Sequence, residues 1–334
     1  MKTILDSLKS RLHGSRSRLV LPEGKDDRIL LAADRLISED IARPIVLGNE
    51  TTVSSRIEEL SLSSDIKVLD PTHSDRIALY GQSYIKSRPR TKARVAEKLI
   101  SKPLFFAGMM VREGDGEAML AGVSCATSKV IEAGQLTIGL AKGIRTPSSC
   151  FLMIVPDFQG AEKLLIFADC AVNIEPDASQ LADIAAASAV SARRILGEPP
   201  KVAMLSFSTQ GSAQHPSVDK VREAAAMARD RNPDLDIDGE FQADTALIKA
   251  VADKKCRVES EVAGQANVLI FPNLDAGNIA YKLTQYLANA VAVGPLLQGF
   301  SRPVSDLSRG ASVDDIVDTA VLLLATSGQR PVPD

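Results

Sequence analysis

Residues 18–38 read RLVLPEGKDDRILLAADRLIS, and this stretch decides the fold class. The unbroken apolar run Arg18–Leu21 ends at a Pro-Glu-Gly turn, which favours a fully buried strand. Asp26–Ser38 follows with apolar residues spaced three and four apart, the pattern of an amphipathic helix. We therefore predict a strand followed directly by a helix, the repeating unit of an α/β protein.

The same alternation of short apolar runs and amphipathic segments continues through the chain. The further strands that we predict are Pro44–Leu47, Leu104–Ala107, Phe151–Val155, Val202–Leu205 and Val268–Phe271. The further helices that we predict are Asp177–Leu196, Ser217–Arg231, Gln242–Asp253 and Ala276–Ala290. Apolar strands separated by helices indicate mainly parallel sheets that are covered on both faces.

The length of 334 residues predicts about two domains rather than one. We expect two α/β lobes with a cleft between them. The first comprises residues 1–147 with 300–334, and the second comprises residues 148–299. Ligands of open α/β sheets bind beyond the carboxyl ends of the strands, so we expect a site on the loops that follow strands.

The composition excludes several classes of protein. Lys and Arg number 39 against 42 Asp and Glu, and the net charge of −3 argues against a nucleic-acid partner. The four cysteines and three histidines show no metal-binding spacing, so we expect no metal and no disulfide framework. No apolar stretch is long enough for a membrane span and no signal segment is evident, so we expect a soluble, cytoplasmic protein.

Residues 306–315, DLSRGASVDD, form the most informative loop, because an amphipathic helix is predicted directly after it. Ser312 and Asp315 have the spacing of a capping box, which satisfies the free amides of a helix start. A helix start also attracts anions, and the guanidinium of Arg309 and the hydroxyl of Ser308 suit a phosphate or carboxylate. A helix cap and an anion site both remain open on the residues alone.

Two further segments offer groups that bind anions. Residues 206–216, SFSTQGSAQHP, follow a predicted strand and are rich in hydroxyls, so they form either a phosphate cradle or a serine-rich turn. Residues 84–94, YIKSRPRTKAR, carry several cations around a helix break at Pro89. These cations form either a solvated face or, through one or two members, part of an anion site.

Longer motifs along nearly the whole chain resemble one known family. They are VLPEG at 20–24, GD at 114–115 with AG at 121–122, FSTQGSA at 207–213, DGEFQ at 238–242, ANVLIFPNLDAGN at 266–278, and GP at 294–295 with PVSDLSRG at 303–310. In this order they resemble the phosphate acetyltransferases, or phosphotransacetylases. The resemblance implies reversible transfer of an acetyl group between coenzyme A and inorganic phosphate, a homodimer, and a fold related to isocitrate-type dehydrogenases.

The resemblance also implies roles for single residues. Asp315 is then the base that takes the proton of the coenzyme A thiol, Arg309 holds the phosphate, and Ser308 donates to the oxyanion or steadies the sulfur. Our hypothesis is a direct attack of the thiolate on the carbonyl carbon of acetyl phosphate. Coenzyme A is a substrate in this scheme, and no tightly bound cofactor is expected. The residues expected to bind substrate are Arg88, Thr127, Lys129, Ser208, Thr209, Gly211, Ser212 and Gly310.

One departure from the family pattern concerns positive charge. The pattern has an arginine where this chain has Glu132. Lys129 lies one helical turn earlier, and we expect it to supply the missing charge. The departure affects the expected phosphate affinity and acyl preference more than the reaction type.

Three alternatives stay open at this point. A phosphate butyryltransferase, or another short-chain phosphate acyltransferase, differs in a small apolar pocket where one methylene is worth about 1–3 kcal/mol. A regulatory module that binds acyl-CoA without catalysis is disfavoured because Ser308, Arg309 and Asp315 are all retained. A nicotinamide-dependent dehydrogenase of the related fold is disfavoured because no ribose-binding acid follows a glycine fingerprint.

Overall fold

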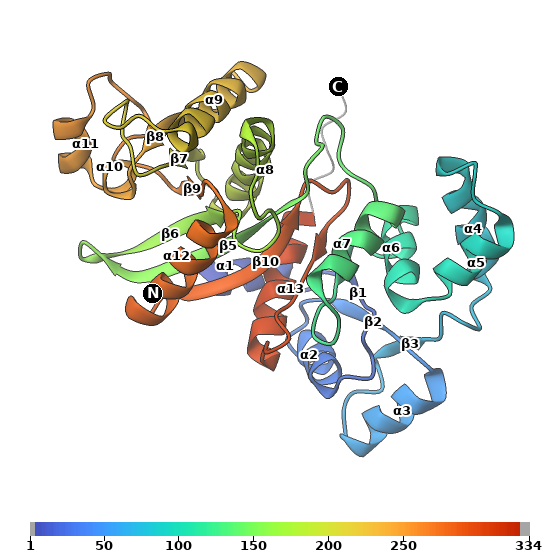
Figure 1. The fold of residues 1–334 in the computed structure, drawn as a ribbon. Helices are drawn as coiled ribbons and strands as arrows, with labels where there is room; N and C mark the ends of the chain where they lie inside the picture. Colours follow the sequence, from blue (N-terminus) through green and yellow to red (C-terminus); the bar gives the residue numbers. More distant parts are fainter. Residues whose placement is uncertain (1–3, 328–334) are drawn as a thin grey trace. The chain divides into compact units, whose positions relative to one another are not determined.

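The computed structural model describes residues 4–327 as alternating α-helices and β-strands (Figure 1). The chain divides into two compact units. Within the described residues, unit 1 comprises 4–142 and 300–327, and unit 2 comprises 143–299. Unit 1 is therefore assembled from both ends of the chain, while unit 2 is continuous.

The sheet of unit 1 has the order β3-β2-β1-β4-β11, and each neighbouring pair is parallel. The strands are β1 (Arg18–Leu21), β2 (Arg43–Leu47), β3 (Lys67–Leu69), β4 (Ala118–Leu120) and β11 (Val304–Ser305). The helices are α1 (Ile4–Leu12), α2 (Asp27–Ser38), α3 (Glu50–Glu59), α4 (Arg76–Ser87), α5 (Ala93–Ile100), α6 (Pro103–Glu113), α7 (Thr127–Thr137) and α13 (Val313–Ser327).

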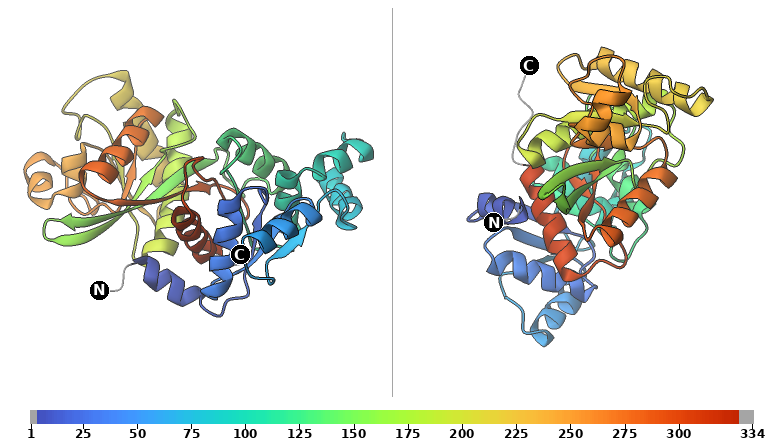
Figure 2. Two further views of the ribbon diagram at one scale, coloured as in Figure 1. Left: turned by 90° about the horizontal axis from the view of Figure 1, so that it is seen from below. Right: turned by 90° about the vertical axis from the view of Figure 1, so that its left-hand side faces the viewer.

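Helices cover both faces of this sheet. Helix α13 packs against α1 and α2 (Figure 2), while α6 packs on β1 and β4 beside α4, α5 and α7. Consecutive residues of β4 are buried, as a strand between two helical layers requires. The predicted strand and helix of residues 18–38 are confirmed, and Asp26 caps α2 by accepting a hydrogen bond from the Arg28 amide.

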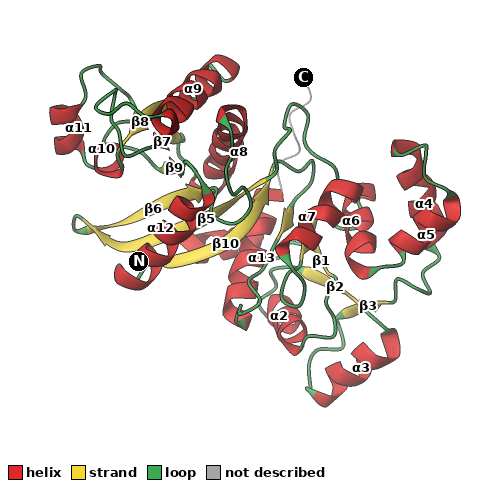
Figure 3. Ribbon diagram, in the orientation of Figure 1, coloured by secondary structure: helices red, strands yellow, loops and turns green. Residues whose placement is uncertain are grey.

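The sheet of unit 2 has the order β10-β5-β6-β9-β7-β8, and Figure 3 shows these strands in yellow. The strands are β5 (Ser148–Phe158), β6 (Ala161–Ala168), β7 (Lys201–Leu205), β8 (Asp236–Phe241), β9 (Val268–Ile270) and β10 (Val291–Gln298). The pairs from β6 to β8 are parallel, whereas β5 is antiparallel to both neighbours. The mainly parallel sheets predicted from the sequence are confirmed, with β5 as the strand that departs.

The departure has a local cause. Gln159 and Gly160 both have positive φ and join β5 to β6 in a two-residue turn. Such a turn matches the twist of a hairpin and forces the two strands to run antiparallel. We did not predict β6, because the charged residues Glu162 and Lys163 near its start conceal the apolar run that follows.

Helices again form two layers in unit 2. They are α8 (Ala178–Leu196), α9 (Pro216–Arg231), α10 (Ala243–Leu247), α11 (Lys249–Lys255) and α12 (Leu274–Leu287). Helix α8 packs on the sheet together with α9. Side chains from α10, α11 and α12 join a separate apolar cluster with Phe151, Met153 and Phe241 of the strands. The predicted helix over Gln242–Asp253 is interrupted, because Ile248 has extended backbone between α10 and α11.

The strand predicted at Leu104–Ala107 is wrong, since these residues belong to α6. Pro103 occupies the first turn of this helix, where its missing N–H costs nothing, and Gly114 ends it with a left-handed backbone. Every residue from Phe105 to Val111 is buried, so the helix has no polar face. A short apolar run surrounded by protein on all sides cannot be distinguished from a buried strand by periodicity.

Candidate active site

The order of the strands in the sheet of unit 1 reverses at β1. From β1 the chain proceeds to β2 and β3 on one side, and it returns to β4 on the other side of β1. The helices that follow β1 and β4, α2 and α7, pack against different neighbours, α13 and α6 respectively. The loops beyond β1 and β4 therefore diverge, which creates the crevice where α/β proteins bind ligands.

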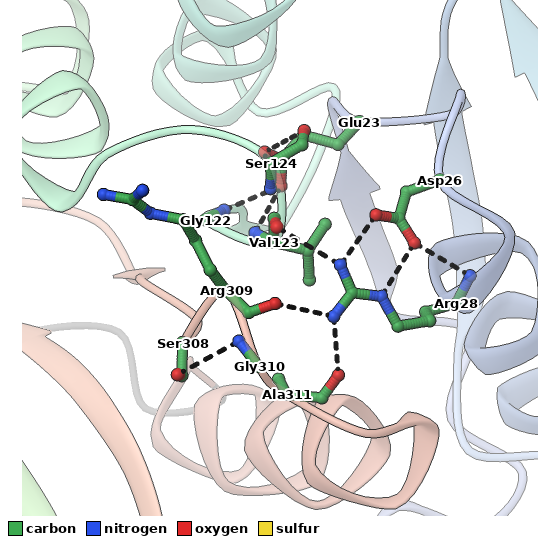
Figure 4. Close-up of polar contacts among 10 residues, drawn as sticks. All are labelled: Glu23, Asp26, Arg28, Gly122, Val123, Ser124, Ser308, Arg309, Gly310 and Ala311. Carbon is green, nitrogen blue, oxygen red and sulfur yellow. Dashed lines mark hydrogen bonds and ion pairs between the residues drawn. The ribbon is translucent and has the colours of Figure 1, made fainter.

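A carboxylate joins the loops that follow β1 and β4 (Figure 4). Glu23 accepts hydrogen bonds from the amides of Gly122, Val123 and Ser124 at 2.7, 3.0 and 2.9 Å. It also accepts one from the Ser124 hydroxyl at 2.7 Å. One side chain thus holds three consecutive amides after β4, and the loop is fixed before any ligand arrives.

A guanidinium joins the same loops to the one that follows β11. Arg28 donates to the carbonyl oxygens of Arg309, Ala311 and Val123 at 2.8, 2.9 and 3.2 Å. It also forms a bidentate pair with Asp26, at 2.9 and 2.8 Å, and this pair lowers the pKa of Asp26. We call this set of contacts the Arg28 clamp.

The Arg28 clamp leaves the side chains of Ser308 and Arg309 exposed on the surface of the loop. Arg309 is exposed, and Figure 4 shows its side chain extending away from Arg28 while its carbonyl oxygen faces the clamp. Within residues 4–327 the Arg309 guanidinium has no hydrogen-bond or ion-pair partner. Ser308 is also exposed, and its Oγ accepts a hydrogen bond from the Gly310 amide at 3.3 Å.

The predicted capping box at the start of α13 is confirmed. Oδ2 of Asp315 accepts hydrogen bonds from the amide and the hydroxyl of Ser312 at 2.9 and 2.8 Å, and the Asp315 amide donates to the Ser312 hydroxyl at 3.2 Å. Asp315 remains exposed, and no hydrogen bond from the described residues reaches its Oδ1. The cap therefore orients the carboxylate while one oxygen stays open to solvent.

Asp306, directly before this loop, is a buried carboxyl that sequence analysis did not assign to the site. Its side chain is 3% exposed, and Oδ2 accepts a hydrogen bond from the hydroxyl of Thr127 at the start of α7. Burial raises the pKa of Asp306 to about 6, although the Thr127 hydroxyl and the Leu307 amide act in the opposite direction. The predicted substrate ligand Thr127 thus already has a partner in the protein.

The predicted cations Arg88 and Lys129 lie near opposite ends of α7. Arg88 donates to the carbonyl oxygen of Gln135 at 3.1 Å and lies over the ring of Tyr84. Lys129 forms an ion pair with Glu132, with Nζ and Oε2 2.7 Å apart. Lys129, which we expected to supply positive charge, is therefore neutralised by Glu132, the acid at the position where the resemblance implies an arginine.

A cavity of about 400 Å³ opens beside Glu23 and Lys129. Its lining residues come mainly from α5, α6, α7 and the loop after β4, and the surface that they expose to the cavity is largely apolar. They are Glu23, Leu99, Lys102, Pro103, Leu104, Phe105, Ser124, Cys125, Lys129 and Glu132. Burial and the neighbouring Glu23 carboxylate raise the pKa of the Cys125 thiol to about 12. This thiol therefore stays protonated at neutral pH and is a poor nucleophile.

The hydroxyl-rich loop of unit 2 surrounds a carboxylate of its own chain. Glu240 is 2% exposed, and its Oε1 accepts hydrogen bonds from the Ser208 hydroxyl at 2.9 Å and the Gly211 amide at 2.8 Å. The Thr209 amide donates to the Ser212 hydroxyl at 3.0 Å. Burial favours the neutral acid, but these hydrogen bonds and Arg222 outweigh it and hold the pKa of Glu240 below its usual value.

Sequence reasoning predicted a site on the loop and helix start that carry Ser308, Arg309 and Asp315, but it did not predict the contacts that hold this loop. Glu23 lies in a quoted motif directly after a strand, and that position was the available signal. Arg28 offered none, because an arginine in the first turn of an amphipathic helix is indistinguishable from an ordinary surface residue.

Comparison with known proteins identifies the family of the chain. Residues 3–324 match a family model described as phosphate acetyl/butaryl transferase. The chain is 40% identical to the phosphate acetyltransferase of Clostridium acetobutylicum over 333 residues, which cover 98% of this chain and 99% of that protein. It is also similar to the structure of the EutD phosphotransacetylase from Staphylococcus aureus, with 40% identity, a TM-score of 0.89 and coverage of 97% and 98%.

The chain belongs to the phosphate acetyl/butyryltransferase family of acyltransferases. Its fold extends beyond this family: a 4-hydroxythreonine-4-phosphate dehydrogenase from Salmonella typhimurium is similar, with a TM-score of 0.55, 12% identity and coverage of 93% and 99%. This likeness concerns the fold alone. No helix among the described residues is long and apolar enough to span a membrane.

Replacing Arg28 by alanine should loosen the Ser308–Arg309 loop. The substitution removes three hydrogen bonds to main-chain oxygens, and we expect it to lower the free energy of unfolding by about 1–3 kcal/mol. Hydrogen exchange of the amides from 307 to 311 should accelerate, as mass spectrometry of the intact chain can measure.

Arg56→Ala is the matched control. Arg56 of α3 forms a bidentate pair with Asp27 of α2, at 2.9 and 2.7 Å, but touches none of the three loops. Equal acceleration at 307–311 in both variants would show that the clamp does not hold this loop.

Proposed function

We propose that this protein transfers an acetyl group between acetyl-CoA and inorganic phosphate, forming CoA and acetyl phosphate. The observation that carries the proposal is the start of α13, where Ser308, Arg309 and Asp315 lie within one loop and one helical turn. A cation, a hydroxyl and an oriented carboxylate are the groups that phosphate and a thiol require. The names of relatives that are about 40% identical over nearly the whole chain support the same reaction.

The reaction needs a base, because a thiol is a weak nucleophile until it loses its proton. In the direction of acetyl-CoA synthesis, Oδ1 of Asp315 takes the thiol proton and the sulfur attacks the carbonyl carbon. The new S–C bond forms as the C–O bond to phosphate breaks, and phosphate leaves with the electron pair. In the reverse direction phosphate attacks acetyl-CoA, and Asp315 returns the proton to the departing thiolate.

Arg309 and Ser308 act on the charges that develop. The Arg309 guanidinium binds the phosphate oxygens in a planar fork and stabilises the charge that grows as the C–O bond breaks. Ser308 donates its hydroxyl proton to the carbonyl oxyanion or to the sulfur. The Arg28 clamp holds the backbone of Arg309 and Ala311, on the same loop as Ser308, so that little reorganisation is needed when substrate binds.

The cysteines support a direct transfer without an acyl-enzyme. The pKa of each of the four thiols is raised, with burial as the largest cause. A raised pKa leaves little thiolate to accept an acetyl group at neutral pH. All four cysteines are also unpaired, which suits the cytoplasmic location that we propose.

We propose that the cavity beside Glu23 receives the pantetheine arm of coenzyme A. The methylene and methyl groups of that arm suit the largely apolar surface of the cavity, and Lys102, which lines the same cavity, offers charge to the phosphates. Its volume is at the lower end of the range for small-molecule sites, about 300–1,000 Å³. A short acyl group such as acetyl is favoured over butyryl by the names of the relatives.

The decisive experiment measures free thiol released from acetyl-, propionyl- and butyryl-CoA in the presence and absence of phosphate. We expect phosphate-dependent release that is fastest with acetyl-CoA. Fastest release with butyryl-CoA indicates the butyryltransferase alternative. Binding of acetyl-CoA without release indicates a regulatory module, and absence of both binding and release refutes the proposal.

Replacing Asp315 by asparagine should remove the base and keep the helix cap, because an amide oxygen accepts hydrogen bonds from Ser312 as a carboxylate does. We expect kcat to fall about 10²–10⁴-fold, as for other general bases, with unchanged thermal unfolding. Asp314→Asn is the control, since Asp314 lies beside it and pairs with Arg35 instead. A near-normal kcat in Asp315→Asn would exclude the general-base role.

The pair of Lys129 and Glu132 tests how the chain compensates for the missing arginine. Glu132→Gln frees the ammonium and should lower the KM for phosphate about two- to fivefold, while Lys129→Ala should raise it, as expected for exposed charges. Glu58→Gln on α3 is a control for the change in net charge. If neither variant alters this KM, another cation binds the phosphate.

We also propose that the protein is a homodimer that associates through α12. Ile279, Leu283, Tyr286 and Leu287 share one face of this helix and are 56%, 52%, 76% and 79% exposed. An apolar helix face with few charges is typical of a permanent interface. A second copy offers the same surface, so a two-fold interface is self-complementary.

Ile279→Asp combined with Leu287→Asp should convert the dimer to a monomer, because each buries a charge in the interface. Light scattering after gel filtration measures the mass. Val258→Asp is the control, since Val258 is 69% exposed elsewhere in unit 2. A dimer that survives the double substitution would exclude this face.

A further inference from the structure

Asp306 is a buried charge that the proposed reaction does not use. It follows β11 directly and lies two and three residues before Ser308 and Arg309. Its Oδ2 accepts the hydrogen bond from Thr127, whereas its Oδ1 is buried and has no hydrogen-bond partner within residues 4–327. Two of the three loops of the site therefore meet through this one carboxyl group.

Gly122 packs closely against Asp306. A Cβ atom at Gly122 would lie 2.4 Å from Oδ1 of Asp306 and 2.5 Å from the Leu307 amide nitrogen. The loop after β4 thus presses on the carboxyl group and on the loop that carries Ser308. Only glycine permits this approach, and Gly122 also has φ at +122°.

The charges around Asp306 do not stabilise its anion. The titratable groups that face it are Glu23, after β1, and Cys125, after β4, and neither is a cation. From α7 it receives only the hydroxyl of Thr127. A buried carboxylate without a cation is costly for stability, and an asparagine of the same shape would avoid that cost. The carboxyl group therefore requires a reason other than packing.

We propose that ionised Asp306 is a positioning residue for the Ser308–Arg309 loop, holding it against the start of α7 through Thr127. An ionised Asp306 carboxylate accepts the hydrogen bond from the Thr127 hydroxyl, and this bond keeps the peptide group between Asp306 and Leu307 in place. A protonated Asp306 competes as a donor, weakens that bond and releases the loop. Small displacements of reacting groups lower rates strongly, so the effect falls on kcat. The kinetic part of this inference rests on the proposed acetyl transfer.

The direction of the pH dependence follows from the carboxyl group. Because the pKa of Asp306 is about 6, lowering the pH through this value protonates it and should reduce kcat. Loss of the Thr127 hydroxyl removes a bond to the ionised form, so the acid limb of the kcat profile should move to higher pH.

The test compares Thr127→Val, Thr127→Ser and Asp306→Asn in the full chain. Thr127→Val should lower kcat about tenfold or more with little change in the KM for CoA, and it should shift the acid limb upward. Thr127→Ser keeps the hydroxyl and should restore the rate and the profile. Asp306→Asn should abolish the acid limb at a lower kcat. If Asp306→Asn does not fold, the two Thr127 variants still decide.

Hydrogen exchange separates this inference from the proposed function. Exchange of amides 307–311, corrected for its intrinsic pH dependence, should increase in the wild type as pH falls from about 8 to 5, and it should be high throughout in Thr127→Val. If the wild type transfers no acetyl group, the proposed function fails, and exchange alone decides whether Asp306 holds the loop. Unchanged exchange, an unmoved acid limb, or a change in KM alone would overturn the inference.

Discussion

The site in unit 1 depends on one guanidinium. Arg28 reaches three main-chain oxygens in two loops and an aspartate at the start of its own helix. A planar group with five donors suits this task, because its hydrogen bonds fix direction as well as distance. The oxygens that it binds belong to residues whose side chains point elsewhere. Main-chain anchoring thus leaves the side chains of Ser308 and Arg309 exposed to solvent.

Two neighbouring carboxylates serve opposite purposes around this anchor. Glu23 is satisfied by four donors from one loop, so its charge is compensated by oriented amides. Asp306 has one hydroxyl donor and an unmatched oxygen. The first arrangement is rigid, whereas the second responds to protonation. In unit 2, Glu240 follows the first pattern, and its carboxylate occupies the ring of donors formed by the hydroxyl-rich loop.

Much of the fold was accessible from sequence, because strands and helices of ordinary length alternate with clear turn signals. The helix at 27–38 ends within the predicted limits, and Asp26 caps it as its residue type suggests. The error at Leu104–Ala107 and the missed β6 both arise because the hydrophobic periodicity is concealed. In α6 it is concealed by burial on all sides, and in β6 by charged residues near one end. At the candidate site, the start of α13 could be predicted from the four residues Ser312–Asp315, which have the spacing of a capping box. The contacts between Arg28 and Arg309 span 281 positions, and no local pattern records them.

Unit 1 combines an early and a late segment of the chain, which has a consequence for folding during translation. A growing polypeptide has all of unit 2 available before β11 and α13 are made. The strand and helix that bring Ser308, Arg309 and Asp315 are the last described parts to emerge from the ribosome. Until then the first lobe lacks its fifth strand, and helices α1 and α2 lack the neighbour on which they pack. Domains generally fold as units during synthesis, so a product terminated before residue 300 carries all of unit 2 but none of the residues that we propose for catalysis.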